Sequence, residues 1–236
     1  MRAFSPAPSQ SNSPGFVTGF LRRGGLAVFG SGIAVKGISL LVAIFVARVL
    51  DREVYGSISY AVVLATAIIP FASSAFPRTL LRYGAVLQGE PEQAALFSRL
   101  FRWGLLVALS AAVVVFLGAD ILCANQPQST GFLQILALLF VSDFLFETLQ
   151  IRLRLQKRNR TFALTGLARS LLLITFTVTL LTATGPVGYA IALATAPLLA
   201  VGLFVRCFPR PSKSELAPLT PKNRELWCFG AMVGLS

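Results

Sequence analysis

The sequence predicts an all-α membrane protein whose chain crosses the bilayer several times. Of its 236 residues, 55% are hydrophobic and 13% are charged, whereas a soluble domain carries about 25% charged residues. The apolar residues gather in blocks of roughly 20, the length of helix that crosses a ~30 Å hydrocarbon core. The basic residues alternate between rich and poor connecting segments, which is the pattern that orients polytopic membrane proteins.

Taken in chain order, the apolar blocks predict six transmembrane helices. Residues 1–20 are rich in Ser and Pro and predict a disordered cytoplasmic tail. Residues 21–208 form the predicted lobe, and residues 209–226 are charged and Pro-rich, as expected of a cytoplasmic linker between two lobes. Residues 227–236 indicate the start of a truncated seventh helix, since a full crossing needs about 20 residues. We place the six helices at residues 24–49, 56–76, 102–119, 130–150, 162–183 and 186–208.

Two prolines fall inside these blocks, Pro70 in the second and Pro197 in the sixth. Membrane helices tolerate proline because neighbouring groups satisfy the freed carbonyls. We therefore expect each proline to kink its helix, or alternatively to mark a bending point of a moving helix.

The charge distribution predicts the orientation of the chain. Seventeen of the 21 basic residues lie in the N-terminal tail and in or beside every second connecting segment. Because cytoplasmic loops carry an excess of Lys and Arg, residues 77–101, 151–161 and 209–226 and the N-terminus are expected in the cytoplasm of a bacterial inner membrane. The 119–129 connection, which contains Cys123, is expected outside and open to thiol reagents. This distribution accounts for most of the +12 charge without nucleic acid, and membrane lipids are expected partners of the basic loops.

Composition and motifs argue against an enzyme or a metal protein. The chain has no His and only three Cys, without a CxxC spacing, so neither a disulfide framework nor a zinc site is expected. No Gly-rich phosphate loop or DDxxD cluster occurs. We expect no catalytic residues and no cofactor.

Lys36 is the first of the ionisable residues inside the predicted helices. It lies 12 residues into the first block, about 18 Å deep at 1.5 Å per residue and thus near the midplane. Charges at this depth usually face a bundle interior or a water-filled cavity. No partner at its depth is evident in the sequence, so Lys36 is expected to face a hydrated lumen and receive an anion.

Asp143, Glu147 and Gln150 form a polar stripe on the fourth block, and Arg169 lies in the fifth. Asp143 precedes the centre of the 151–161 hairpin by 13 residues, and Arg169 follows that centre by 13. If the two helices are antiparallel neighbours, Asp143 and Arg169 lie at the same depth and are expected to pair. Two interpretations stay open: the charges merely neutralise each other, or they line a polar lumen.

The junction Ala47-Arg48-Val49-Leu50-Asp51-Arg52-Glu53-Val54-Tyr55-Gly56 resembles the "ARxLGPxxYG" junction of a known transporter group. That group is the polysaccharide (O-antigen or exopolysaccharide) flippase family of the multidrug/oligosaccharidyl-lipid/polysaccharide exporter superfamily. Asp51 and Arg52 replace the usual Gly-Pro. Arg82, in the following FPRTLLRY segment, matches a recurrent arginine of the family, and the segment from Arg152 to Arg169 is similar to its basic loop and fifth helix. The matching motif positions are Ala47, Arg48, Tyr55, Gly56 and Arg82.

The resemblance implies two six-helix lobes around a central lumen, of which this chain holds the N-terminal one. It implies transport of a polyprenyl-diphosphate-linked oligosaccharide, for lipopolysaccharide or other polysaccharide synthesis, with other polysaccharide-assembly membrane proteins as further partners. Lys36 and Arg169 would then hold the diphosphate. The truncated seventh block suggests a fragment of a longer protein. Two other interpretations remain: a cation-coupled multidrug antiporter of the same superfamily, using Asp143 and Glu147, or a non-transporting scaffold of a glycan-assembly complex.

Overall fold

The computed structural model describes residues 25–70, 75–86 and 90–205. The predicted tail (1–20), linker (209–226) and seventh-helix start (227–236) lie outside the described residues. Helices account for nearly all of the described chain, and no strand occurs in it. The helices are α2 (Gly25–Val49), α3 (Arg52–Ile69), α4 (Ala75–Val86), α5 (Glu90–Leu122), the short 3-10 helix η2 (Pro127–Ser129), α6 (Thr130–Leu155), α7 (Asn159–Thr184) and α8 (Pro186–Leu203).

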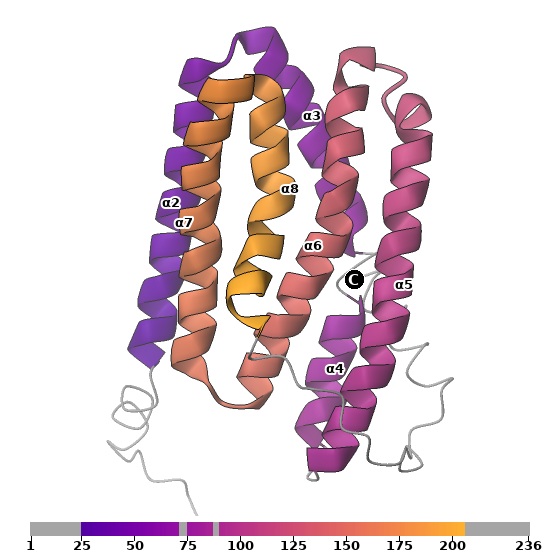
Figure 1. The fold of residues 1–236 in the computed structure, drawn as a ribbon, viewed down its shortest axis with the longest axis vertical. Helices are drawn as coiled ribbons and strands as arrows, with labels where there is room; N and C mark the ends of the chain where they lie inside the picture. The colour runs from indigo at the N-terminus through magenta and orange to yellow at the C-terminus, as the bar shows by residue number, and fades with distance from the viewer. Residues whose placement is uncertain (1–24, 71–74, 87–89, 206–236) are drawn as a thin grey trace, which may run out of the picture.

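Six of these helices are long and apolar enough to cross a membrane, which confirms the predicted all-α, six-span fold. They are α2, α3, α5, α6, α7 and α8. In Figure 1 the α2–α3, α5–α6 and α7–α8 connections lie together at the upper end. The last turn of α4, the first turn of α5, the α6–α7 connection and the start of α2 lie at the lower end of the lobe.

The prediction of a loop over residues 77–101 is wrong, because α4 and the first part of α5 are helical there and pack against each other. Its apolar residues are spaced for a helix pair: Leu80 of α4 and Leu96, Phe97 and Leu100 of α5 are buried in one cluster with Ile151 of α6. The hairpin is amphipathic rather than wholly apolar, so a prediction based on membrane-spanning length overlooks it. The third helix accordingly begins at Glu90 instead of residue 102.

The two prolines behave differently. Pro70 follows the last residue of α3 as its C-cap, so the second span ends several residues before the predicted residue 76, and α4 packs along α5 and α6 below it. Pro197 stays inside a continuous α8. The residues around Pro197 in α8 are small, and Ala190, Ala192, Ala194 and Ala196 are buried. Small residues let neighbouring helix backbones approach closely.

Helix α6 is the central helix of the lobe. It packs against α3, α4, α5 and α8, whereas α2 packs mainly on α7. Although α6 and α7 form a hairpin, α8 lies between them along one side in Figure 1, and their direct contact is slight. This divergence leaves room between α6 and α7 on the side that faces α2.

Candidate binding cleft

A cleft of about 690 Å³ opens between α2, α4, α6 and α7. Its walls come from the first half of α2, the second half of α6, the first half of α7 and the first turns of α4. Between the polar residues the walls are apolar or small, as at Gly32, Phe146 and Gly166. The polar side chains that line it are Ser31, Lys36, Arg78, Glu147, Gln150, Arg154 and Arg169.

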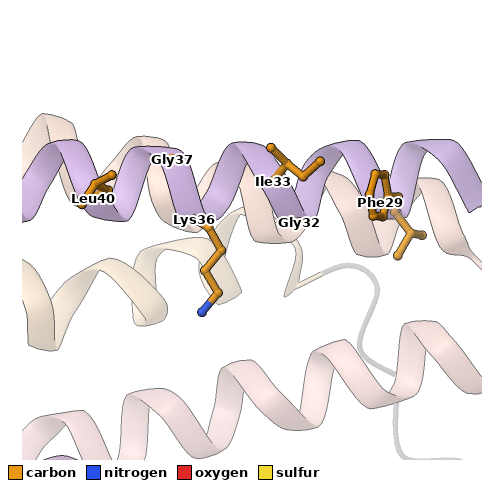
Figure 2. A pocket seen from close by; sticks show the side chains of 7 residues that line it. Phe29, Gly32, Ile33, Lys36, Gly37 and Leu40 are labelled. Carbon is orange, nitrogen blue, oxygen red and sulfur yellow. The ribbon is translucent and has the colours of Figure 1, made fainter.

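Lys36 reaches this cleft from α2. Figure 2 shows its side chain extending from α2 toward the neighbouring helices, whereas Ile33 points the other way. Lys36 is exposed and forms no hydrogen bond or ion pair with any other described residue. It also borders a shallow hollow along α2 that Gly32 and Gly37 help to form. The ammonium group is therefore available to an anion.

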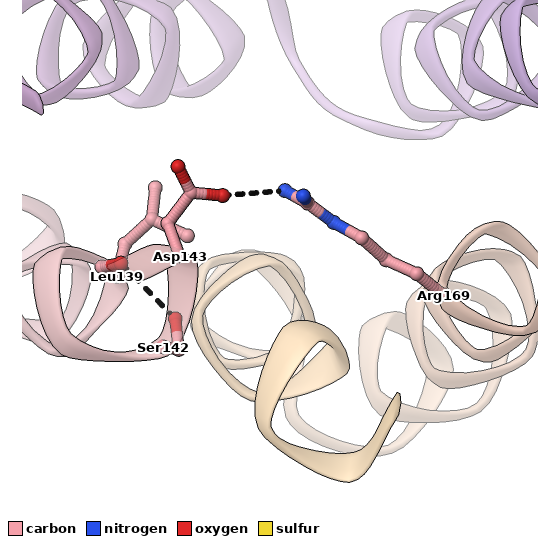
Figure 3. Close-up of polar contacts among 4 residues, drawn as sticks. All are labelled: Leu139, Ser142, Asp143 and Arg169. Carbon is pink, nitrogen blue, oxygen red and sulfur yellow. Dashed lines mark hydrogen bonds and ion pairs between the residues drawn. The ribbon is translucent and has the colours of Figure 1, made fainter. Parts of the chain in front are cut away.

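Asp143 and Arg169 form the predicted ion pair. Arg169 Nη2 lies 3.1 Å from Asp143 Oδ1, and Figure 3 shows the two side chains meeting across the space between α6 and α7. The guanidinium group also lies over the Phe146 ring, 4.7 Å from its centroid. The Arg169 side chain remains 34% exposed, against 13% for Asp143, so the arginine keeps donors that Asp143 does not use.

Arg169 separates two cavities. One side of it borders the main cleft. The other side, with Asp143, borders a smaller cavity of about 270 Å³ between α3, α6, α7 and α8, which Thr66 and Pro197 also line. The predicted polar stripe is thus divided: Glu147 and Gln150 face the main cleft, and Asp143 faces the smaller one.

Gln150 ties the two helices of the hairpin together below the ion pair. Its Nε2 donates to Thr165 Oγ1 at 2.8 Å, and the Thr165 hydroxyl donates to the Phe162 carbonyl at 2.8 Å. Farther toward the hairpin, Arg154 stacks over the Phe162 ring with its Cζ 4.4 Å from the centroid.

Among the described residues, the cleft carries an excess of positive charge. Lys36, Arg78, Arg154 and Arg169 line it, and Glu147 is the one carboxylate that the described part of the chain contributes. Even if Asp143 is counted through its pairing with Arg169, the cations outnumber the acids. Charges act more strongly in a partly dehydrated cleft than in bulk water, so the arrangement suits an anionic ligand.

Sequence reasoning missed Arg78 as a residue of the cleft. The family-motif positions, in contrast, do not line the cleft. Arg78 was assigned to a loop because its helix, α4, was not predicted. The motif residues Ala47, Arg48, Tyr55 and Gly56 lie at the opposite end of the lobe, where Tyr55 packs near Val42, Val46 and Leu181. Arg82 is exposed on α4, with its Cζ 5.9 Å from the Tyr83 ring centroid. These five positions therefore do not line the cleft.

A six-helix lobe with a polar cleft in its membrane-spanning part defines the class of multi-pass membrane proteins that includes exporters. The chain matches the polysaccharide biosynthesis protein family over residues 21–211. It therefore belongs to that family. No curated protein sequence matches it.

Two solved structures share its fold. One is a MOP superfamily transporter from Pyrococcus furiosus, described as having a binding pocket of reverse polarity; it is 18% identical with a TM-score of 0.68. The other is a multidrug resistance MATE family transporter of the MOP superfamily in an outward-facing conformation, 16% identical with a TM-score of 0.66. Each alignment covers 90% of this chain and 50% of the other, so the chain spans about half the length of these transporters.

Proposed function

We propose that the chain forms one lobe of a flippase in the bacterial cytoplasmic membrane, with its N-terminus in the cytoplasm. The substrate is a polyprenyl-diphosphate-linked oligosaccharide. Membership of a polysaccharide biosynthesis family supports a glycan substrate. The observation that carries the proposal is Lys36, a cation that pairs with no described residue, in a cleft whose described lining already has excess positive charge.

Different residues of the cleft bind different parts of such a lipid. Lys36 supplies a mobile point charge, and Arg169 supplies a planar fork of donors. Both suit a diphosphate, which offers several oxygens at short spacing. Glu147 and Gln150 provide hydrogen-bonding groups for sugar hydroxyls beside the phosphate site. The polyprenyl chain stays in the lipid along the apolar outer faces of the helices.

Transport also requires a second lobe. Alternating access uses two repeats that rock against each other around a site near the midplane. Because this chain spans about half of the similar transporters, we propose that a second lobe, in a longer form of the protein or in a second chain, closes the lumen over Lys36.

The two alternative functions have less support. A cation-coupled antiporter needs free acidic groups in its lumen, but Asp143 is held by Arg169 at 3.1 Å, and the described residues that line the main cleft include one carboxylate and four cations. A non-transporting scaffold gives no reason for placing an unpaired Lys36 in a cleft, since an intramembrane charge is costly.

Transport in proteoliposomes tests the proposal. The complete transporter is reconstituted, and a labelled lipid-linked oligosaccharide is followed from one leaflet to the other. The expected result is a flip rate well above that of empty vesicles. Export of an organic cation driven by an ion gradient, without lipid flipping, would support the antiporter instead. Movement of neither compound would favour the scaffold.

A further inference from the structure

Arg152 of α6 lies on the opposite side of this helix from the cleft. Gln150 and Arg154 line the cleft, whereas Arg152 does not. It is two residues from each of them, which is about 200° around a helix of 3.6 residues per turn. Its guanidinium group instead lies over the ring of Phe97 in α5, with Cζ 4.9 Å from the ring centroid. Arg152 therefore belongs to the contact between α5 and α6.

Phe97 is a firmly held platform for this guanidinium group. The Phe97 side chain is buried and stacks on Phe101, with ring centroids 5.8 Å apart and 14° between the planes. Phe101 in turn lies 5.9 Å from the ring of Phe144 in α6, which is fully buried. A cation over a ring face is attracted by the ring without using its N–H groups. The platform therefore orients Arg152 and leaves its donors for another partner.

No described residue supplies that partner. Arg152 Nε is buried and has no hydrogen-bond acceptor, and the side chain forms no ion pair with a described carboxylate. Arg158, in the α6–α7 connection, acts on Arg152 as a like charge. Buried polar groups are normally satisfied by protein, solvent or a ligand. The site is therefore suited to an anion from outside the described part of the chain.

The depth of Arg152 indicates which anion is at hand. Helix α6 begins at Thr130, and Arg152 follows 22 residues later, which is about 33 Å along the helix at 1.5 Å per residue. This length slightly exceeds the ~30 Å hydrocarbon core. Phe97 lies at the start of the membrane-spanning part of α5, Leu96–Leu122. The pair therefore lies at the level of the lipid headgroups, where basic sites between helices bind anionic lipids.

We propose that Arg152 binds the headgroup phosphate of an anionic bilayer phospholipid at the contact between α5 and α6. The planar guanidinium group can donate two parallel hydrogen bonds to phosphate oxygens, and Arg158 adds positive charge nearby. The bound lipid stabilises the fold, because Phe97 packs in the cluster that joins α4, α5 and Ile151 of α6. This inference does not rest on the proposed function, since the site lies away from the cleft.

Lipid-dependent thermal unfolding tests the site. The full chain is unfolded in uncharged detergent micelles with added phosphatidylglycerol or phosphatidylcholine. A ligand of the folded state raises the midpoint, so wild type should gain stability from phosphatidylglycerol beyond any gain from phosphatidylcholine. Arg152→Gln should lose this gain and bind phosphatidylglycerol roughly tenfold more weakly. Arg152→Lys should keep part of it, because lysine retains the charge without the planar fork.

Two further variants separate the site from general effects. Arg160→Gln removes an exposed charge from the first turn of α7 at the same end of the lobe and should keep the full gain. Phe97→Leu retains the charge of Arg152 but removes the aromatic platform, and it should bind the lipid more weakly. Because each variant is compared with itself in the two lipids, a change in stability that is independent of lipid cancels. If Arg152→Gln does not fold, Phe97→Leu and Arg152→Lys decide the test.

Three results would overturn the inference. The first is a gain from phosphatidylglycerol in Arg152→Gln, or in both Phe97→Leu and Arg152→Lys, that equals the wild-type gain. The second is an equal loss in Arg160→Gln, which would show a general surface-charge effect. The third is stabilisation by farnesyl diphosphate but not by phosphatidylglycerol, lost in Arg152→Gln, which would assign the site to a diphosphate substrate instead of a bilayer lipid.

Discussion

The two ends of α6 differ sharply. Its first half, toward the end that holds the α5–α6 connection, packs against two helices: Leu133, Leu136, Ala137 and Phe140 are buried with Ala61 and Ala65 of α3 and Val115 and Ala119 of α5. Its second half, from Asp143 onward, carries Glu147, Gln150 and Arg154 into the cleft. One helix therefore seals the lobe at one end and lines a polar space at the other.

The difference shows how a single lobe provides half of a lumen. Packing of α3 and α5 fixes the first half of α6, and α8, which contacts both α6 and α7, lies between these two helices. Because the polar residues begin where the apolar core ends, the cleft does not continue through the lobe. The cleft therefore opens toward the end of the lobe that holds the α6–α7 hairpin.

Reversing the ion pair should produce the largest loss of stability. Asp143→Arg or Arg169→Asp alone places like charges together, and breaking a buried pair costs about 3–5 kcal/mol. Since a third of the Arg169 side chain is exposed, the cost should fall near the lower limit. Asp143→Arg/Arg169→Asp together should recover folded protein, measured by thermal unfolding in detergent. Equal damage in the single and double variants would contradict direct pairing.

The second largest loss of stability is expected from overpacking the contact between α5 and α6. A Cβ at Gly104 of α5 would meet the ring of Phe144 and approach Phe76 Cβ at 3.1 Å, and Phe144 is fully buried. Gly104→Ala should therefore destabilise the lobe by about 1–3 kcal/mol, as overpacking does.

Gly118 is the matched control on the same helix, because nothing lies within 4 Å of its Cβ position. Gly118→Ala should be neutral or stabilising by up to about 1 kcal/mol, since Ala favours the helix. Equal midpoints of thermal unfolding for the two variants would show that α5 and α6 are not held as closely as described.

The smallest expected effect is on the labelling of Cys123, near the α5–α6 connection, by thiol reagents. Cys123 lies in the turn after α5, but it is buried in the cluster that includes Ala61, Ala119 and Leu133, so the expectation that it is open to thiol reagents is wrong. Burial raises the pKa of its thiol, with Asp120 adding to the shift and a hydrogen bond with Thr130 opposing it. A smaller fraction is therefore thiolate at neutral pH, and labelling should increase as pH rises.

An introduced cysteine gives the cleaner topological test. Ala124 is exposed beside Cys123, so in a Cys-less background Ala124→Cys should react with an impermeant maleimide in intact cells. Gln156→Cys, exposed in the α6–α7 hairpin, should react only after lysis. The reverse pattern would contradict the proposed orientation.

Much of this lobe is predictable from the sequence, for identifiable reasons. Apolar blocks locate the six spans because the bilayer fixes their length. The Asp143–Arg169 pair follows from equal spacing about one hairpin, which sets equal depth in antiparallel helices. The α4 helix and Arg78 were missed because an amphipathic helix has no membrane-spanning length to reveal it. Burial of Cys123 depends partly on Ala61 and Ala65 of α3, which are distant in sequence.

Transport by the Lys36→Ala variant tests the central claim most directly. Lys36 is exposed and unpaired among the described residues, so its loss should leave folding intact. In proteoliposomes of the complete transporter, Lys36→Ala should abolish flipping of labelled lipid-linked oligosaccharide, while Arg160→Ala, which removes an exposed charge outside the cleft, should flip at the wild-type rate. Normal flipping by Lys36→Ala would contradict the assignment of this cleft as the substrate lumen.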